Sequence, residues 1–305
     1  MSHLEAETEL LGSSVAVADE LAQAPRRSAL RAVLRAPEGR IGVALALLVL
    51  AVVILGPLLA PYPPDKLGVG PVSAGPTASH LLGTDTLGRD VLSRVLCGGT
   101  SVIVIPLLAV VLAQLLGGGM GLAAGYLGGR WDAVLSRVFD IFMTLPPLLL
   151  VLVLIAGLGT SAAVLVIVVA LVFLPRAGRI VRAATQSLVH ADYVVAAQTR
   201  GESATYVVGR EILPNIVGPL MADAALRLTY AIIFVATLNF LGLGVQPPRP
   251  DWAVMISEGR ATIAITPIVV FAPAAAIAAV SVSANLIADA LTAHWSPDAP
   301  RAGGL

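Results

Sequence analysis

The feature that most constrains this chain is a series of six apolar blocks, each long enough to cross a bilayer. The first, Ile41–Ala60, has about 20 residues, and a helix of that length spans a hydrocarbon core of about 30 Å. The other blocks are residues 100–126, 139–157, 160–181, 217–243 and 264–290. Only helices and closed barrels satisfy all backbone polar groups within a bilayer. We therefore expect an all-α integral membrane protein with about six transmembrane helices.

The overall composition supports this class of protein. Hydrophobic residues make up 57% of the 305-residue chain and charged residues 12%, about half of the roughly 25% that soluble domains carry. This balance argues against a disordered protein, a nucleic-acid binder and most soluble enzymes. The single cysteine, Cys97, excludes an intrachain disulfide and a thiol-based metal cluster.

The first apolar block is too long for a signal peptide and is followed by a proline-rich stretch rather than a small-residue cleavage site. We interpret residues 41–60 as an uncleaved first transmembrane helix that follows a cytoplasmic segment, residues 1–40. Residues 61–98 are polar and rich in Pro and Gly, which predicts an extracytoplasmic loop with one short helix.

The basic residues predict the orientation of the helices. With the N-terminus inside, 13 arginines fall in inside segments and five basic residues fall in outside segments. The inside segments are residues 1–40, 127–138, 176–216 and 291–305. Since inside loops carry the excess of Lys and Arg, we expect both termini, including a tail of residues 296–305, in the cytoplasm.

The sequence shows no pattern typical of an active site. The only lysine, Lys66, is not part of a phosphate-binding Gly-Lys-Ser/Thr loop, so the chain cannot be a P-loop ATPase by itself. The four histidines have no metal-ligand spacing, and no Gly-x-Ser-x-Gly motif occurs. We expect no catalytic, cofactor or metal site in this chain.

The fifth apolar block contains two charges, Asp223 and Arg227, spaced i, i+4 as in a helical ion pair. A structural pair is the favoured interpretation, and a role in a substrate path is the alternative. In the second block, Gly117, Gly121 and Gly125 share one helix face, which predicts close packing against another helix. An ion-driven secondary carrier is a second possible function, but such carriers have internal repeats, and we find no convincing one.

The most informative inside segment is residues 176–216, the longest inside loop. Ala191–Arg200 predicts a short helix, Gly201 suits its C-terminal turn, and Glu202–Leu213 predicts a second helix before Pro214 returns the chain to the membrane. A helix–Gly–helix element at the cytoplasmic surface can dock in a groove of another protein. A helix lying on the lipid surface is nearly as good an interpretation.

This loop resembles the inner-membrane permease subunits of ATP-binding-cassette (ABC) importers. Their signature is Glu-Ala-Ala, three residues, Gly, nine residues and Ile-x-Leu-Pro. The matching positions here are Ala196, Ala197, Gly201, Leu213 and Pro214, with Ile212 beside the expected Ile position, which Glu211 occupies. Val195 replaces the glutamate of the signature.

Two further stretches are similar to the C-type permease of dipeptide and oligopeptide importers. They are Gly83–Arg94, ahead of the second apolar block, and Phe240–Trp252 with the following Glu258–Arg260. The resemblance covers about residues 30–295. It implies a type I ABC importer permease fold, with residues 99–295 as a core of five transmembrane helices.

The resemblance also implies a function and partners. The chain would form half of the path for dipeptides, oligopeptides or a related small solute, together with a second homologous permease in a bacterial inner membrane. Two cytoplasmic ABC ATPase domains would bind ATP and Mg and push on the inside loop. An external substrate-binding protein would contact the outer loop, where the candidate residues are Gln246, Pro247, Pro248, Asp251 and Trp252.

Overall fold

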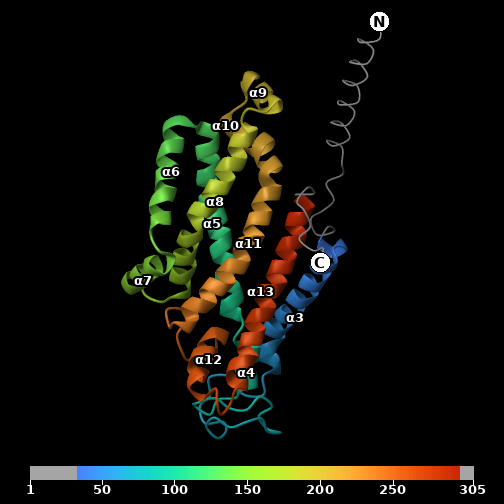
Figure 1. Cartoon of the computed structure of the whole chain (residues 1–305), viewed down its shortest axis with the longest axis vertical. Helices are drawn as coiled ribbons and strands as arrows, with labels where there is room; N and C mark the ends of the chain where they lie inside the picture. The colour runs from blue at the N-terminus through green and yellow to red at the C-terminus, as the bar shows by residue number, and fades with distance from the viewer. Residues whose placement is uncertain (1–32, 296–305) are drawn as a thin grey trace.

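The structure is a computed structural model that describes residues 33–295. Within this range the regular elements are helices, the longer of which run along the long axis of the molecule (Figure 1). Five helices are long and apolar enough to cross a membrane, and one bent helix pair makes a sixth crossing if the pair forms a single span. The predicted all-α architecture with about six transmembrane helices is confirmed.

The helices follow the predicted blocks in order. They are α3 (Pro37–Leu59), α4 (Val91–Cys97), α5 (Thr100–Leu127), α6 (Gly129–Thr144), α7 (Pro147–Leu158), α8 (Ala162–Leu188), α9 (Asp192–Thr199), α10 (Ala204–Tyr206), α11 (Leu213–Phe240), α12 (Trp252–Gly259) and α13 (Ile268–Trp295). A π-helical segment, Val207–Ile212, joins α10 to α11, and a 3-10 turn, Arg260–Thr262, follows α12. The expectations for residues 1–32 and for the tail 296–305 lie outside the described residues.

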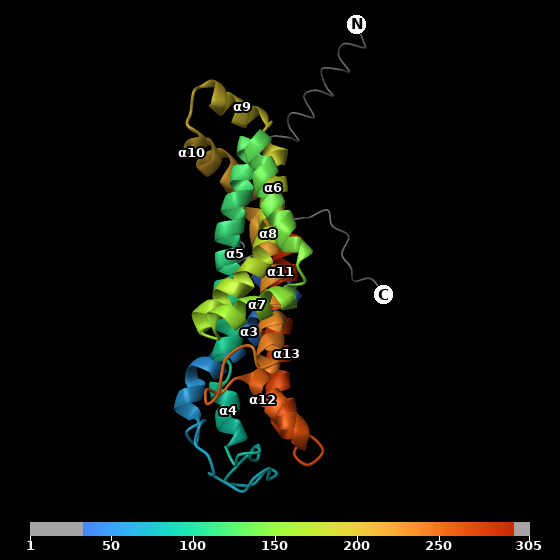
Figure 2. The same ribbon diagram turned by 90° about the vertical axis from the view of Figure 1, so that its left-hand side faces the viewer.

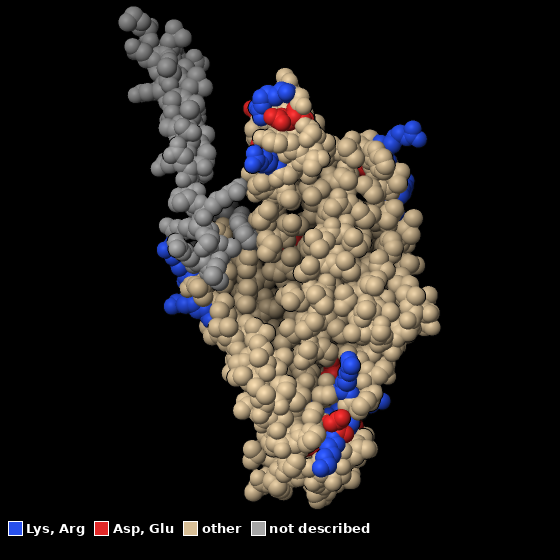
Figure 3. All heavy atoms as spheres, turned by 180° about the vertical axis from the view of Figure 1, so that it is seen from behind, with Lys and Arg blue, Asp and Glu red and all other residues tan. Residues whose placement is uncertain are grey.

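The two ends of the molecule are built differently. Helices α9 and α10 lie at one end, whereas α4, α12 and the loop before α4 lie at the other (Figures 1 and 2). Helix α3 begins and α13 ends on the α9 side of the molecule. On the face shown in Figure 3, the charged side chains gather toward the two ends and along one edge, and other residues form the broad surface between. This distribution suits helices that cross a bilayer.

The glycine face of α5 packs directly on α8, as predicted. A Cβ atom on Gly117 would lie 2.3 Å from the carbonyl oxygen of Leu174, and one on Gly121 would lie 2.3 Å from that of Gly178. Gly178 in turn leaves room for the ring of Phe139 from α6. These positions let α5, α8 and α6 approach closely, which is how helices associate tightly in a membrane.

The predicted third transmembrane helix, residues 139–157, is wrong as a single element. The helix begins ten residues earlier, at Gly129, and breaks after Thr144, so that α6 and α7 meet at 90°. Pro146 disfavours the helical conformation for the residue before it, and Leu145 is extended, with φ −83° and ψ 130°. The apolar block is therefore continuous in hydropathy but not in backbone conformation.

The flanking helices extend into the predicted inside loop, 176–216, whose position relative to the membrane stays a prediction. Helix α8 continues through Pro175 and Arg176 to Leu188. On the other side, the helical path runs from Ala204 through the π-helical segment into α11, and Pro214 lies in the first turn of α11. A proline is tolerated there because the N–H groups of a first helical turn need no partner within the helix.

Candidate functional site

The segment between α8 and α11 holds the short helix α9 against a small apolar core. Val194 and Ala197 are the buried residues of α9, and they pack in one cluster with Val181, Val207 and Ile212. These partners come from α8 and from the π-helical segment. One face of α9 is thereby fixed to the two long helices that flank it in the sequence.

The opposite face of α9 is exposed at the tip of the molecule (Figure 2). It carries Tyr193 (42% exposed), Val195 (45% exposed) and Ala196. Ala196 and Ala197 both match the family signature, but their surroundings differ, because Ala197 faces the core. Val195, at the position of the signature glutamate, points outward beside Ala196.

Gly201 ends α9 in a left-handed conformation, with φ +77°. Its N–H donates to the carbonyl of Gln198 at 2.9 Å, and the N–H of Glu202 donates to the carbonyl of Ala197 at 3.2 Å. This closes the helix as in a Schellman-type turn. No atom of residues 33–295 outside the turn itself lies within 4 Å of a Cβ placed on Gly201. Within this chain, the backbone conformation rather than a close neighbour requires glycine there.

The other residues expected in the coupling loop lie inside or beside the α9 core. Ile212 is fully buried, and Leu213 packs against the edge of the same cluster. Pro214 is half-buried in the first turn of α11. Of the six predicted positions, Ala196 and Gly201 are therefore exposed, Ala197, Ile212 and Leu213 pack in the α9 core, and Pro214 lies in α11.

At the opposite end, Asp251 caps α12 instead of facing solvent. Its Oδ1 accepts from the N–H groups of Ala253 (2.8 Å) and Val254 (3.0 Å), and its Oδ2 accepts from Asn239 Nδ2 (2.8 Å) and the hydroxyl of Ser101. Burial raises the pKa of Asp251, although these hydrogen bonds act in the opposite direction. Asp251 therefore joins α12 to the ends of α5 and α11.

Trp252 is also buried, and its indole Nε1 donates to the carbonyl of Val95 at 2.7 Å. The expectation that Asp251 and Trp252 contact an external protein is not met by their positions, because both side chains are inside. Gln246, Pro247 and Pro248 are exposed. These three residues remain available as a contact surface in the loop between α11 and α12.

Four charged residues that we did not single out as a site form a cluster at this end. Arg89 Nε lies 2.6 Å from Asp85 Oδ2, and Arg89 Nη2 lies 2.7 Å from Glu258 Oε2. Arg94 Nη1 lies 2.5 Å from Asp85 and 2.9 Å from Glu258. The cluster ties the loop before α4 to α12. All four residues belong to the two stretches that carry the family resemblance. Their presence in these stretches was the one sign in the sequence that they form a site.

Inside the membrane region, Asp223 and Arg227 form the expected ion pair. Arg227 Nε lies 2.5 Å from Asp223 Oδ2 and Nη2 lies 2.8 Å from Oδ1. Gln114 of α5 also donates to Asp223, at 2.8 Å. The pair is mostly buried, and through Gln114 it connects α11 with α5.

Two further ion pairs join α6 to α8. Arg182 contacts both carboxylate oxygens of Asp132, with Nη2 2.7 Å from Oδ2, and Arg179 pairs with Asp140. Asp140 lies in the last part of α6, and both partners of its pair with Arg179 remain partly exposed. The spacing within the sequence gave no signal for contacts between residues so far apart.

Comparison with known proteins agrees with this architecture. The family described as binding-protein-dependent transport system inner membrane component matches residues 117–298. The chain is 31% identical to the glutathione transport system permease protein GsiD of Pectobacterium atrosepticum, over 94% of this chain and 96% of that protein. It is 35% identical to the probable D,D-dipeptide transport system permease protein DdpC of Escherichia coli, over 84% and 85% of the two chains. It is 38% identical to the dipeptide transport system permease protein DppC of Alkalihalophilus pseudofirmus, over 73% of each. The chain therefore belongs to the family of binding-protein-dependent transport system inner membrane components, the permease subunits of ABC importers.

Proposed function

We propose that this permease subunit forms half of the translocation path for short peptides or a related small solute. The observation that carries the proposal is the similarity to three permease proteins named for glutathione, D,D-dipeptide and dipeptide transport, which extends over most of each chain. The other half of the path would be a second, homologous permease.

The coupling to ATP would take place at α9. Its exposed face, with Tyr193, Val195 and Ala196, offers a small apolar surface that can seat in a groove of a cytoplasmic ATPase domain. Its other face is packed on α8 and the start of α11 through Val194 and Ala197. A push on α9 would therefore be passed to two transmembrane helices. Two partner ATPase domains would bind ATP and Mg, and this chain would bind no cofactor.

The proposed orientation places the α9 end and both termini in the cytoplasm of a bacterial cell, with the protein in the inner membrane. The excess of arginines in the inside segments supports this orientation. The opposite end, with α12 and the charge cluster, would then face the external substrate-binding protein. Gln246, Pro247 and Pro248 are the exposed outer-loop residues proposed to contact it.

Gentle solubilisation of this protein from its own membranes tests the proposal. We expect a second permease and P-loop ATPase subunits to remain bound, and the recovered assembly to hydrolyse ATP. After reconstitution in vesicles with the external binding protein, peptide uptake should require ATP and should stop with a non-hydrolysable analogue. Recovery of this chain alone, active in ion-driven uptake without ATP, would contradict the proposal.

A further inference from the structure

The helical path between α10 and α11 contains one turn that is wider than the rest. Over Val207–Ile212 the backbone is π-helical, and the N–H of Leu213 donates to the carbonyl of Val208, five residues before it. A π-helical turn holds one residue more than an α-helical turn, is rare, and occurs frequently at functional sites. We call residues 207–212 the wide turn.

The buried residues around the wide turn show what it does for α9. Val207, Ile212 and Ile216 all face the α9 core and are at most 2% exposed. In a regular helix, where successive residues are about 100° apart, Val207 would point about 140° away from Ile212. Ile212 and Ile216 are four residues apart and share a side without any correction. The extra residue therefore brings Val207 to the side of Ile212, where both hold α9 on the start of α11.

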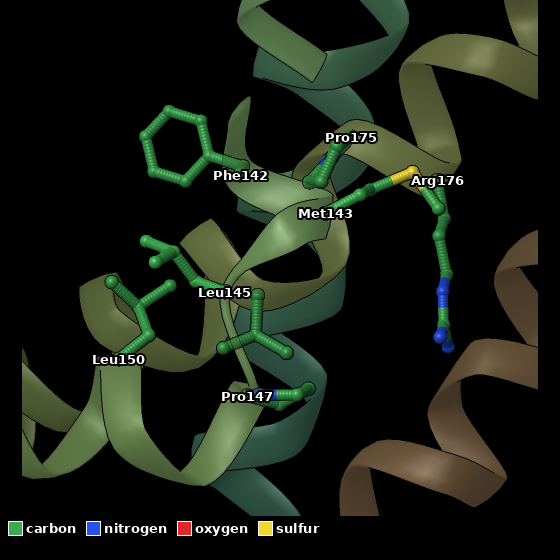
Figure 4. Close-up of a pocket in the computed structure, with 8 residues that line it drawn as sticks. Phe142, Met143, Leu145, Pro147, Leu150, Pro175 and Arg176 are labelled. Atoms are coloured by element: carbon green, nitrogen blue, oxygen red, sulfur yellow. The ribbon is translucent and has the colours of Figure 1, made fainter. Parts of the chain in front are cut away.

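Proline alone does not explain the wide turn. Pro175 lies inside α8, and the α-helix continues past it to Leu188. At Pro146 and Pro147 the chain instead bends by 90°, beside a hollow of about 80 Å³ (Figure 4). Two other proline positions thus give a regular helix and a sharp break. The packing of the α9 core is what holds the wide turn after α10.

The surroundings of the wide turn allow it to change into a regular one. Pro214 has no N–H group, so no backbone hydrogen bond from this position has to be exchanged. Asn215 Nδ2 donates to the carbonyl of Glu211 at 2.6 Å and satisfies it from a side chain. Gly209 and Arg210 are exposed. The outer side of the turn therefore does not oppose a rotation.

We propose that the wide turn is a register switch that changes how α9 is held on α11 during transport. This inference rests on the proposed coupling at α9. In the switched state the turn is a regular α-helix, and the extra residue has passed into the loop at Glu202 and Ser203. The segment 204–208 then shifts by about 1.5 Å and turns by about 100° about the helix axis. Val207 leaves the α9 core, so that α9 and α11 can move relative to one another.

ATP binding would drive the switch through α9. A partner shifts an equilibrium between two states only if it interacts differently with them. An ATPase domain docked on α9 meets this condition, because α9 is held by Val207 in one state and not in the other. The switch would thereby let α9 follow the ATPase domains while α11 changes its own position.

The first measurement follows the position of Val207 directly. It uses the complete importer with its ATPase subunits in lipid nanodiscs, with Cys97→Ala to remove the natural thiol and either Val207→Cys or Val194→Cys. Both valines are fully buried in the α9 core. We expect a maleimide to label Val207→Cys several-fold faster with a non-hydrolysable ATP analogue than without nucleotide. Val194→Cys should stay protected, because α9 remains packed on Ile212.

Two results of the labelling would overturn the switch. Equal labelling of Val207→Cys with and without the analogue would show that the turn does not change. Faster labelling of both Val207→Cys and Val194→Cys would show that α9 leaves its core as a whole.

Deletion of Gly209 is the second test. It removes the extra residue without removing a packing contact, because no atom from another part of the described structure lies within 4 Å of a Cβ placed there. Val207 and Ile212 are then four residues apart and face the same side of a regular helix to within about 40°. The α9 core should form, but the turn has no second register. We expect ATP hydrolysis to continue and ATP-dependent peptide uptake to be lost.

Gly209→Ala is the matched control, because it keeps the number of residues, and it should take up peptide normally. Normal uptake by the deletion variant would show that the wide turn only sets the register of a fixed contact, and this would overturn the switch. If the wild-type assembly shows no ATP-dependent peptide uptake, the proposed function itself has failed, whichever way Val207→Cys is labelled.

Discussion

Arg94 of α4 and Glu258 of α12 lie 164 positions apart in the chain, and Arg94 Nη1 is 2.9 Å from Glu258 Oε2. Asp85 and Arg89 complete a cluster of two positive and two negative charges. Three of the four side chains are almost completely buried, whereas Glu258 is 26% exposed. The α12 end of the bundle is therefore joined through charges from two distant segments.

Glu258→Gln is expected to destabilise the α12 end. The substitution leaves Asp85 as the one carboxylate in the cluster for two buried guanidinium groups. Breaking a fully buried pair costs about 3–5 kcal/mol, and the partial exposure of Glu258 reduces the expected loss to on the order of 2 kcal/mol. The melting temperature of the purified protein in detergent should fall by several degrees. Arg249→Gln, at an exposed position of the loop before α12, should not change it. An unchanged melting temperature for Glu258→Gln would contradict the structural role of the cluster.

The same cluster should make the α12 end sensitive to acid. Burial alone would raise the pKa of Asp85, but the N–H groups of Arg89 and Leu87 and the guanidinium groups of Arg94 and Arg89 hold it below its ordinary value. A carboxylate with a lowered folded-state pKa stabilises the fold above an unfolded-state pKa of about 4, and this contribution is lost as pH falls below that value.

Melting temperatures measured between pH 5 and pH 3 would test this acid sensitivity. The decline should be steeper in the wild type than in Asp85→Asn, which no longer has the ionisable group. Asp251 contributes with the opposite sign, because its pKa is raised and its protonation favours the folded state. Since both proteins contain Asp251, the difference between the two curves isolates Asp85. Parallel curves would be inconsistent with the predicted role.

The membrane class and the contact between α5 and α8 could be predicted because both depend on patterns within one segment. Block length gives the number of crossings, and a four-residue glycine spacing gives a face. The sequence was a poorer guide to where a helix continues and where it breaks. Hydropathy reports which residues suit lipid, so Arg176 suggested an end to a helix that in fact continues to Leu188. Conversely, the uninterrupted apolar character around Pro146 hid a 90° bend.

The candidate sites show the same limit. The pair Asp223–Arg227 was predictable because both residues lie on one helix at a suitable spacing. The link to Gln114, and the contact between Arg94 and Glu258, depend on how separate elements pack. Likewise, the sequence could align Ala196 and Ala197 with a family signature but could not say which of them faces the α9 core.

Gly201→Val should abolish transport while leaving the protein in the membrane. A β-branched residue at φ +77° is strained by roughly 1–2 kcal/mol, so the end of α9 would be displaced and docking on an ATPase would be lost. Gly209→Val is the matched control, since Gly209 also has open space around it but no positive φ. Membrane insertion and ATP-dependent uptake are the measurements. Normal uptake by Gly201→Val would show that this turn is not part of the coupling element.

Gly121→Leu should prevent α5 from packing on α8. Even a Cβ atom at this position would lie 2.3 Å from the carbonyl oxygen of Gly178, and backbone cannot easily move away. We expect aggregated or detergent-unstable protein in size-exclusion chromatography. Gly119→Leu should remain monodisperse, because no atom from another part of the described structure lies within 4 Å of a Cβ placed on Gly119. A monodisperse Gly121→Leu variant with wild-type melting would refute close packing at this face.

The pair Asp223–Arg227 allows a test that separates a structural role from a role in the substrate path. Asp223→Asn leaves the buried guanidinium of Arg227 without a counter-charge, and we expect a large drop in melting temperature together with a loss of uptake. The double variant Asp223→Asn/Arg227→Gln removes both charges and keeps amide groups that can hydrogen-bond to each other and to Gln114. If the pair is structural, the double variant should regain most of the stability and most of the uptake that the single variant lost. Recovery of stability without recovery of uptake would instead assign the charges to the path of the solute. The amide groups of the double variant can restore the hydrogen bonds between the helices, but they cannot replace a charge that acts on the solute.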